Sequence, residues 1–393
     1  MKKILALTGI RSDYDLMSSL YRLLHEDPEI ELKLLVAGAH LSPTYGRTVD
    51  IIERDGFDIL LRLETLLDAD SLQSRLKSAS LLLQGSIDLV AQYAPDLILY
   101  AGDREDVMIG ALLGAYLGIP TLHFYGGDHV QDSHVDNPVR HAASKLSTAH
   151  FVCLEEHRRR LLRMGEPDWR IFTIGNMALD RFVAHAPESC ADLLNRLGLP
   201  ADFAPFALLI FHPVTEEREV AGRYFENILL ALRSRGLRAL VGAPNSDPGS
   251  RALIQVAEHY AGDPGFHFFR NLDRNAFVSA YKHCRLIIGN SSAGILESAS
   301  VPVAAVNVGL RQRGRFANAN VLFCGTDREE IERAIDQALS PAFKDQTARV
   351  FNAYGDGDSS RRALEVIKSR EFRPWLHKNE DALIGSETIH ERK

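Results

Sequence analysis

Short apolar segments alternate with helix-forming segments along almost the whole length of this chain. This order is typical of a parallel β-sheet in which each strand is joined to the next by a crossover helix of roughly 12 to 20 residues. Almost every apolar segment ends in Gly, Asp or Asn, residues that allow a strand to turn into the start of a helix. The pattern therefore predicts an α/β fold built on parallel sheets.

The apolar segments form two successive sets, which predicts two Rossmann-like, doubly wound domains. The strands expected in the first set are Lys3–Thr8, Leu32–Ala37, Leu97–Ala101, Thr121–Tyr125, His150–Leu154 and Ile171–Ile174. Those expected in the second set are Ala207–Phe211, Ala239–Gly242, His267–Phe269, Leu286–Ile288, Val303–Val306 and Val321–Phe323. A proline-rich hinge near 176–205 separates the sets, so we assign residues 1–180 to the first domain, 181–370 to the second and 371–393 to a polar tail. Ligands bind outside the carboxyl ends of such strands, so we expect the active site in the cleft between the domains.

The composition is that of a globular protein without a surface for nucleic acid or membrane. Hydrophobic residues make up 46% of the chain and charged residues 25%, and the net charge is −7 with both signs interspersed. No apolar run approaches the roughly 20 residues needed to span a bilayer. The short apolar start runs directly into Gly9, unlike a signal peptide. The four cysteines lie far apart, without the paired spacing of a zinc or redox site, which favours reduced, structural cysteines and a cytoplasmic location.

The most specific motif lies at residues 286–297, where an expected strand is followed by Gly289, two serines and the start of a helix. Unpaired N–H groups and the helix macrodipole make such a start a seat for phosphate, here near Ser291 and Ser292. Glu297 follows about one and a half turns later, where its carboxylate suits two vicinal hydroxyls such as those of a ribose. The segment predicts a nucleotide-sugar seat. The alternative is that Ser291 caps a helix and Glu297 is solvated.

Acidic side chains and histidines gather after two expected strands of the first domain. They are Asp103 and Asp106 after one strand, and Asp128, Asp132, His134 and Asp136 after the next. Converging carboxylates suit proton transfer, because crowding raises the pKa of one and lets it act as an acid while another acts as a base. Two alternatives stay open: Asp103 as a helix cap, and a metal bound by His129, His134 and Asp136.

Other polar residues at strand ends are candidates for contact with a nucleotide. Arg11 follows the first strand, and a guanidinium binds phosphate oxygens bidentately, although the loop lacks the full dinucleotide-binding spacing. His212 suits a diphosphate or a turn, and Asn245 suits a base or a sugar hydroxyl. Arg311 opens a segment of three arginines, which is either a phosphate-binding loop or a solvated turn. No motif for a nucleophilic mechanism stands out.

Taken together, these segments resemble one family over nearly the whole chain: the hydrolysing UDP-N-acetylglucosamine 2-epimerases of bacterial sialic and legionaminic acid synthesis. The matching segments are Thr8–Tyr14, Tyr45–Thr48, Gly102–Arg104, Gly126–Gly127, Val139–His141, Ser144–Ser147, Phe211–Thr215, Gly289–Ile295 and Arg311–Gln312. The resemblance implies a two-domain, glycosyltransferase-B-like fold in which the C-terminal domain holds most of the UDP.

The resemblance also implies a reaction that uses neither a cofactor nor a metal. A base removes the proton at C2 of the sugar while UDP leaves C1, which gives a glycal. Water then adds at C1 and C2 is reprotonated on the opposite face, releasing the free manno-configured sugar and UDP. By position, Asp103 and Asp136 match acid–base residues of the family, with Asp128 and His212 as further candidates. The candidates for binding the UDP-sugar are Arg11, His40, Arg104, Arg140, Asn245, Ser291, Ser292, Gly294, Glu297 and Arg311.

The chain departs from the family pattern in the loop after the strand at 121–125. Tyr125 precedes the glycine pair where Glu or His is common, and Asp128 and Asp106 stand where Glu is usual. A shorter carboxylate moves a proton acceptor by about one C–C bond, and misplacement near 1 Å can cost on the order of 100-fold in rate. We therefore expect a changed sugar, for instance a 4-amino-4,6-dideoxy derivative.

Three other functions stay open at this point. They are a glycosyltransferase of the same fold, a nucleotide-sugar sensor without activity, and a non-hydrolysing epimerase whose product remains linked to UDP. The resemblance further implies a homodimer or homotetramer.

Overall fold

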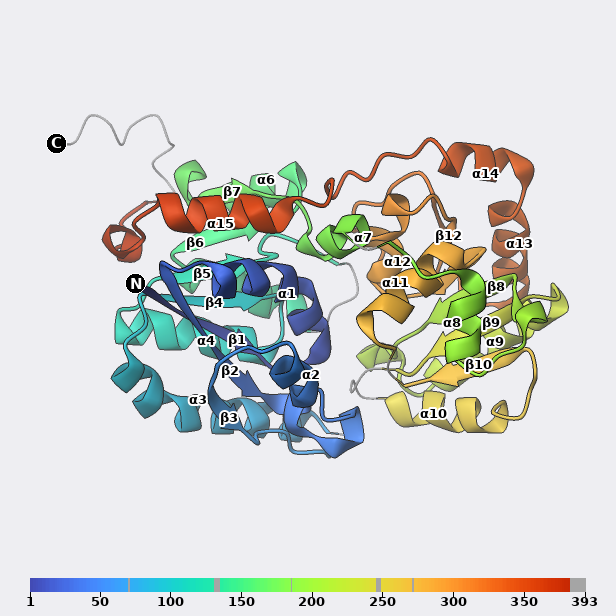
Figure 1. Ribbon diagram of the computed structural model, residues 1–393, viewed down its shortest axis with the longest axis horizontal. Helices are drawn as coiled ribbons and strands as arrows, with labels where there is room; N and C mark the ends of the chain where they lie inside the picture. The colour runs from blue at the N-terminus through green and yellow to red at the C-terminus, as the bar shows by residue number, and fades with distance from the viewer. Residues whose placement is uncertain (70, 131–134, 185, 245–248, 271, 382–393) are drawn as a thin grey trace. The chain divides into compact units, whose positions relative to one another are not determined.

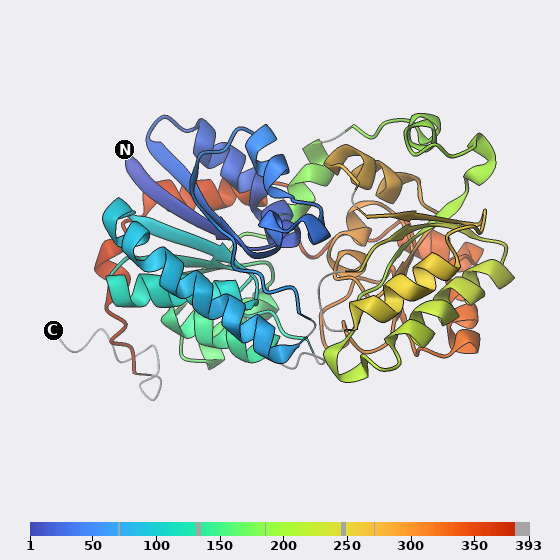
Figure 2. The ribbon, with the colours of Figure 1, turned by 90° about the horizontal axis from the view of Figure 1, so that it is seen from below.

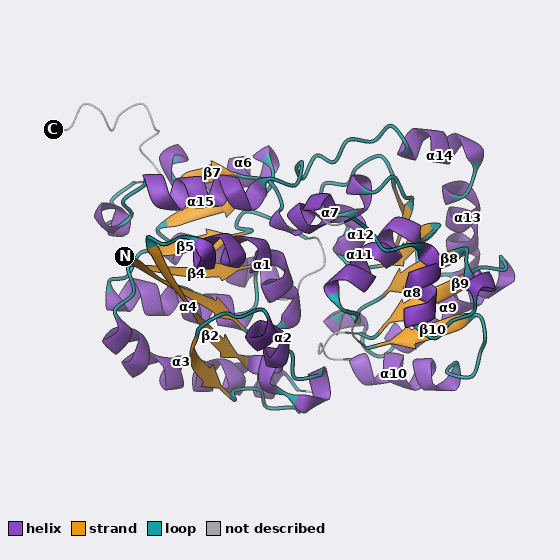
Figure 3. Cartoon of the chain, in the orientation of Figure 1, coloured by secondary structure: helices purple, strands orange, loops and turns teal. Residues whose placement is uncertain are grey.

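The computed structural model describes residues 1–69, 71–130, 135–184, 186–244, 249–270 and 272–381. The chain forms two compact units (Figure 1). The first comprises Met1–His129, Val135–Asp180 and the residues from Gly357 onward, and the second is built from Arg181–Asp356. In each unit, parallel strands form a central sheet with helices on both faces (Figure 3). The doubly wound α/β architecture predicted from the sequence is confirmed.

The sheet of the first unit has the order β3-β2-β1-β4-β5-β6-β7, and every pairing in it is parallel. Its strands are β1 (Lys2–Thr8), β2 (Ile30–Ala37), β3 (Ile59–Leu63), β4 (Leu97–Ala101), β5 (Thr121–Phe124), β6 (Ala149–Val152) and β7 (Ile171–Thr173). The order reverses between β1 and β4. Crossover helices diverge at such a switch point, which opens a crevice at the carboxyl ends of the strands.

Helices cover both faces of this first sheet. They are α1 (Arg11–Glu26), α2 (Val49–Arg54), α3 (Leu72–Tyr93), α4 (Glu105–Leu117), α5 (Asp136–Leu146), α6 (Glu155–Arg163) and α15 (Ser359–Ser369). The short helix α7 (Asp180–Ala184) begins at the last residue of this part of the first unit and continues into the second. The apolar core beneath α3 and α4 contains Leu5, Leu7 and Tyr100. As Figure 2 shows, α15 (red) lies on the opposite face of the sheet from α3 (light blue).

The sheet of the second unit repeats the plan with the parallel order β10-β9-β8-β11-β12-β13. Its strands are β8 (Phe206–Ile210), β9 (Arg238–Gly242), β10 (Phe266–Phe269), β11 (Leu286–Gly289), β12 (Ala305–Val308) and β13 (Val321–Cys324). Its helices are α8 (Cys190–Arg196), α9 (Ala221–Ser234), α10 (Ser250–His259), α11 (Arg274–His283), α12 (Ala293–Leu296), α13 (Arg328–Ala338) and α14 (Pro341–Thr347). The switch point lies between β8 and β11. Within the described part of the chain, no helix is long and apolar enough to cross a membrane.

All twelve predicted strands overlap strands of the structure, and β3 was missed. Every residue of β3 is half-buried or exposed, because it forms the edge of the sheet. An edge strand lacks the continuous apolar run by which buried parallel strands are recognised in a sequence.

The C-terminal part of the chain differs from the sequence-based division. Residues 357–370, assigned above to the second domain, belong to the first unit. Ala363 and Ile367 of α15 are fully buried. The first turn of α15 is held by Asp180, whose two carboxylate oxygens accept the backbone N–H groups of Ser359 at 3.1 Å and Ser360 at 2.7 Å. Amphipathic spacing in the sequence identifies such a helix but does not say which core it covers.

Two carboxylates lie together at the carboxyl end of β1 and the start of α4. Asp13 accepts hydrogen bonds from Thr8 Oγ1 at 2.7 Å and from the N–H of Gly9 at 3.0 Å. Asp106 packs so closely on Gly9 that a Cβ atom there would collide with its carboxyl group. Burial, and then the negative charges of Asp13 and Glu105, raise the pKa of Asp106 to about 7.

This raised pKa predicts a specific pH dependence of stability. The folded chain keeps a proton on Asp106 up to about pH 7, whereas an unfolded aspartate loses it near pH 4. The folded state then binds more protons in this interval, so this carboxyl's contribution to the free energy of unfolding decreases as pH rises from about 4 to about 7. We expect Asp106→Asn to flatten the dependence of Tm on pH over that range, as measured by calorimetry. Asp88→Asn, an exposed change on α3, is the control, and an unchanged profile in Asp106→Asn would contradict the assignment.

Candidate active site

One stripe of α5 carries three polar side chains toward the ends of β4 and β5. Asp136, Arg140 and Ser144 are spaced by four residues, and this spacing places them on the same face of a helix. Arg140 and Ser144 are buried, whereas the side chain of Asp136 is 38% exposed. Each of the three makes a contact that ties α5 to another part of the first unit.

Arg140 holds Asp103 and the loop after β5 together. Its guanidinium pairs with the carboxylate of Asp103 and donates to the carbonyl oxygen of Asp128 at 3.0 Å and to Asn137 Oδ1 at 3.3 Å. Arg140 is 2% exposed, and a buried guanidinium requires such partners because an uncompensated buried charge is strongly unfavourable. The Asp103 side chain, 26% exposed, remains open to solvent on its other side.

Arg75 on α3 links two further carboxylates. It donates to Glu105 Oε2 at 2.7 Å and to Asp136 Oδ1 at 3.4 Å. Burial raises the pKa of Glu105, but the charges of Arg104 and Arg75 outweigh it, so the pKa lies below its usual value. Arg75 was not predicted from the sequence, because it lies far from both partners along the chain and belongs to no motif.

His123 on β5 connects the Asp103 loop to α5. Its Nε2 lies 2.9 Å from the carbonyl oxygen of Gly102, and its Nδ1 lies 2.9 Å from Ser144 Oγ. Because a carbonyl can only accept, Nε2 carries the proton, and in the neutral ring Nδ1 must accept from the Ser144 hydroxyl. Burial lowers the pKa of His123 to about 3, which keeps the ring neutral. Ser144 Oγ also lies 3.0 Å from the carbonyl oxygen of Arg140, which is a second acceptor for its single proton.

The glycine pair before Asp128 has a steric explanation. A Cβ at Gly126 would approach His123 Nδ1 and Ser144 Oγ, each to 3.2 Å, and would crowd their hydrogen bond. Gly127 has φ +73° and lies against the backbone of α6, where a Cβ would collide. Tyr125, at φ 65°, points its hydroxyl to Asn176 Oδ1 at 3.0 Å and is 9% exposed.

Asp128 lies deeper than the other acidic residues of this site. It is 6% exposed, accepts the N–H of His129 at 2.8 Å and lies 3.4 Å from His157 Nε2. His129 stacks on His141 with ring centroids 5.9 Å apart. Burial, and then the positive charge of Arg140, lower the pKa of His141 to about 4. The described residues contain no group of three or more His, Cys, Asp or Glu side chains arranged to hold a metal.

The remaining candidates of the first unit surround the β1–α1 turn and the start of α4. Arg11 pairs with Asp15 at 3.3 Å one turn along α1, and Arg104 is the N-cap residue of α4. His40 is fully buried, with Nε2 2.9 Å from Thr8 Oγ1 and Nδ1 2.7 Å from Thr48 Oγ1. With both ring nitrogens in contact with hydroxyls, His40 would act on a ligand only through its neighbours.

In the second unit, Asn290 bridges the switch point. Its side-chain amide accepts the N–H of His212 at 2.7 Å and donates to the His212 carbonyl at 2.8 Å. Its own carbonyl accepts Arg311 Nη1 at 3.1 Å and Gln312 Nε2 at 3.0 Å. The ends of β8, β11 and β12 are thus tied to one residue, whose role in the motif Gly-Asn-Ser-Ser was not recognised from the sequence.

The serines lie at the start of α12, directly after Asn290. Ser292 is its N-cap residue, and Ser291 Oγ accepts the N–H of Ala293 at 3.3 Å. A small pocket here is lined by Ile210, Ile287, Ile288, Gly289, Ser291, Gly294, Ala305, Val306 and Asn307. Asn307 is 2% exposed, and neither amide atom of its side chain has a hydrogen-bond partner among the described residues. Asn307 was not among the site residues predicted from the sequence.

Glu297 is buried rather than solvated. It is 4% exposed and pairs with Arg181 Nη2 at 3.1 Å. Arg181 is itself largely buried and lies 5.7 Å from the ring centre of Phe277. The alternative of a solvated Glu297 is therefore wrong. Asn245, Asp132 and His134 lie outside the described residues.

Comparisons with known proteins agree with this architecture. A family model described as UDP-N-acetylglucosamine 2-epimerase matches residues 22–368. A Legionella pneumophila protein, named UDP-N,N'-diacetylbacillosamine 2-epimerase (hydrolyzing), is 34% identical over 94% of this chain and 96% of its own length. A Neisseria meningitidis UDP-N-acetylglucosamine 2-epimerase is 31% identical over 94% of this chain and 96% of its own.

The crystal structure of UDP-GlcNAc 2-epimerase from Neisseria meningitidis bound to UDP-GlcNAc matches with a TM-score of 0.79 and 18% identity, covering 94% of this chain and 100% of that chain. This likeness concerns the fold, which in both proteins is glycosyltransferase-B-like. On the family match and the identity to the Legionella protein, the chain belongs to the UDP-N-acetylglucosamine 2-epimerase family.

Proposed function

We propose that this protein is a hydrolysing UDP-N-acetylhexosamine 2-epimerase. A carboxylate removes the C2 proton of the sugar. The electron pair of the broken C2–H bond forms the C1–C2 double bond, while the bond from C1 to the UDP oxygen breaks and its electron pair leaves with UDP. Water then adds its hydroxyl group to C1, and a proton returns to C2 from the opposite face. The products are UDP and a free manno-configured sugar, as a precursor of a nonulosonic acid or another surface glycan.

The α5 stripe is the observation that carries this proposal. It places Asp136 one helical turn before Arg140, which pairs with Asp103, so that each carboxylate lies beside an arginine and is partly exposed, Asp103 at 26% and Asp136 at 38%. Asp103 pairs with the buried Arg140, whereas Asp136 shares the partly exposed Arg75 with Glu105. Two carboxylates in such different settings suit a reaction with separate acid and base steps. We assign these steps to Asp103 and Asp136, with Asp128 and His212 as further candidates.

The second unit would bind the nucleotide. The start of α12, with Ser291 and Ser292, offers N–H groups and hydroxyls to a diphosphate, and Arg311 adds a positive charge. Glu297 is held in place by Arg181, so its carboxylate is oriented in advance to accept hydrogen bonds from ribose hydroxyls.

For the sugar we favour a UDP-4-amino-4,6-dideoxy derivative such as UDP-diacetylbacillosamine, with UDP-GlcNAc as the second choice. The name of the Legionella relative supports the first, and that of the Neisseria relative supports the second. The altered loop with Tyr125 and Asp128 also favours a sugar that differs from GlcNAc. A cytoplasmic homodimer or homotetramer stays a prediction.

The deciding experiment is NMR of UDP-diacetylbacillosamine and of UDP-GlcNAc incubated with the enzyme in D2O. We expect free manno-configured sugar that carries deuterium at C2, together with UDP. A C2 epimer still linked to UDP would show a non-hydrolysing epimerase instead. UDP release that requires an acceptor, without exchange at C2, would show a glycosyltransferase, and binding without reaction would show a sensor.

The assigned acid–base roles predict that Asp103→Asn and Asp136→Asn reduce kcat by about 100- to 10,000-fold, the usual contribution of a positioned acid or base. The affinity for UDP, measured by calorimetry, should stay within a few-fold of the wild type because the nucleotide seat lies in the second unit. Asp88→Asn should have full activity. Either catalytic variant keeping more than a tenth of wild-type kcat would exclude its residue from the chemistry.

If Glu297 binds the ribose, Glu297→Ala should weaken the binding of UDP about 10- to 100-fold, because hydrogen bonds to a charged group contribute about 1.5–3 kcal/mol. The loss should be much smaller for 2',3'-dideoxy-UDP, which lacks the hydroxyls. Arg181→Met keeps the Glu297 carboxylate and removes only its ion-pair partner, so this variant should lose less affinity for UDP than Glu297→Ala does. Equal losses of UDP and the dideoxy analogue would refute contact between Glu297 and the ribose.

A further inference from the structure

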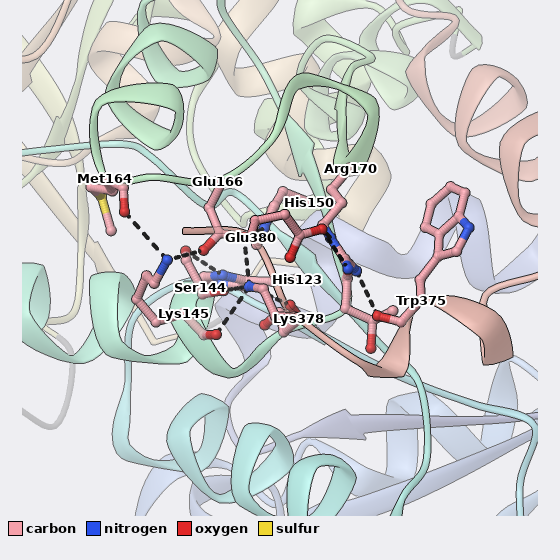
Figure 4. A network of polar contacts seen from close by, with 12 residues as sticks. His123, Ser144, Lys145, His150, Met164, Glu166, Arg170, Trp375, Lys378 and Glu380 are labelled. Carbon is pink, nitrogen blue, oxygen red and sulfur yellow. Dashed lines mark hydrogen bonds and ion pairs between the residues drawn. The ribbon is translucent and has the colours of Figure 1, made fainter. Parts of the chain in front are cut away.

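The segment after α15 folds back along the first unit and reaches the end of α5 (Figure 4). Arg170, 1% exposed, anchors this segment by donating to the carbonyl oxygens of Trp375 at 2.6 Å and His377 at 3.2 Å. Its Nε also donates to Glu380 Oε1 at 3.0 Å. The residues from Trp375 to Glu380 are therefore part of the packed unit and not the loose tail that the sequence predicted.

Lys378 places its ammonium group at the C-terminus of α5. The Nζ atom lies 3.0 Å from the carbonyl oxygens of Lys145 and Ser147 and 3.4 Å from that of Ser144. The carbonyls of a last helical turn have no partner within the helix, and a cation there also interacts favourably with the macrodipole. Lys378 thus acts as a C-terminal cap for α5, although it is more than 230 residues distant in sequence.

A buried anion holds Lys378 in this position. Glu166 Oε2 lies 2.5 Å from Lys378 Nζ and 2.8 Å from His150 Nε2, and its other oxygen lies 2.7 Å from Lys145 Nζ. The Glu166 side chain is fully buried. Burial opposes ionisation, but the hydrogen bond from His150 and the positive charge of Lys378 lower the pKa of Glu166 to about 2. Figure 4 shows this cluster meeting Ser144 and His123 at the end of α5.

The capped turn is the turn that organises the acid–base residues. Ser144 bonds His123, which bonds the carbonyl of Gly102, the residue before Asp103. One turn earlier, Arg140 pairs with Asp103 itself. A shift of the last turn of α5 would move the Ser144 contact directly and the Arg140 contact through the helix. The residues proposed to bind the diphosphate and ribose, Ser291, Ser292 and Glu297, lie in the other unit and have no contact with Lys378 among the described residues.

We propose that Lys378 is a positioning residue for the reaction: by capping α5 across the Glu166 cluster, it fixes the contacts that orient Asp103. This inference rests on the proposed function, because it assumes that Asp103 takes part in catalysis. Lys378 is joined to Asp103 through the last turn of α5 and the hydrogen bonds of Ser144 and His123. Because Asp103 is assigned to the acid–base steps and not to nucleotide binding, loss of the cap lowers kcat rather than the affinity for UDP.

The test compares Lys378→Met, Lys378→Arg and Lys368→Met. Lys378→Met keeps the apolar stem and removes the cap, and we expect kcat to fall at least about tenfold, since small misplacements in an active site have effects of this size or larger. KM and the affinity for UDP should change less than twofold. Lys378→Arg should recover most of the activity because a guanidinium also donates to carbonyls. Lys368→Met removes an exposed ion pair with Asp27 and Glu29 in the same unit and should leave kcat unchanged.

Hydrogen exchange separates this role from a merely structural one. Measured well below Tm, Lys378→Met should exchange faster in α5 and in residues 102–105, while exchange in the second unit stays the same. If Lys378→Met folds poorly, the double variant Glu166→Gln/Lys378→Met, which removes both buried charges, gives the same comparison. An unchanged kcat per folded molecule, or unchanged exchange at 102–105, would overturn the proposal. If the wild type shows no epimerase activity, the proposed function fails, while the exchange result still decides whether Lys378 holds residues 102–105 in place.

Discussion

Burial of the Arg140 guanidinium is the constraint on which the first unit's site depends. A cation that is 2% exposed must be surrounded by acceptors, and here these are the Asp103 carboxylate and the carbonyl of Asp128. The end of β4, the loop after β5 and helix α5 are thereby fixed to a single group. His123 makes a second connection between α5 and the end of β4, through the uncharged Ser144 hydroxyl and the Gly102 carbonyl oxygen. Asp103 is held on one side by these contacts and remains open on the other.

In the second unit, an uncharged residue, Asn290, joins the strand ends in the way that Arg140 does in the first. Both sheets reverse their strand order at one point, and the segments that follow the two strands on either side of that point diverge from there. Asn290 joins them through two hydrogen bonds with the backbone of His212 and through the donors of Arg311 and Gln312. A neutral bridge leaves the helix start beside it without an added negative charge, which suits a site proposed for a diphosphate.

The structure also explains the unusual loop after β5. Tyr125 stands where the family often has an acidic residue or histidine, and its hydroxyl bonds Asn176 within the unit. Asp128 is nearly buried and lies beside His157. Among the described residues of this loop, Tyr125 and Asp128 are both buried, while Asp103 and Asp136 stay partly exposed.

The sequence by itself determined the α/β class, twelve of the thirteen strands in the described structure, and the positions of the acidic and serine-rich strand ends. It could do so because strand periodicity, turn residues and strand-end motifs are local. Partners distant in the sequence were decided only by tertiary structure: Arg75 beside Asp136, Arg181 beside Glu297, and Lys378 at the end of α5. An edge strand such as β3 and a returning segment such as α15 were missed or misassigned for the same reason. Their place depends on which surface they cover, and a one-dimensional pattern records that a residue is apolar or charged but not what it meets.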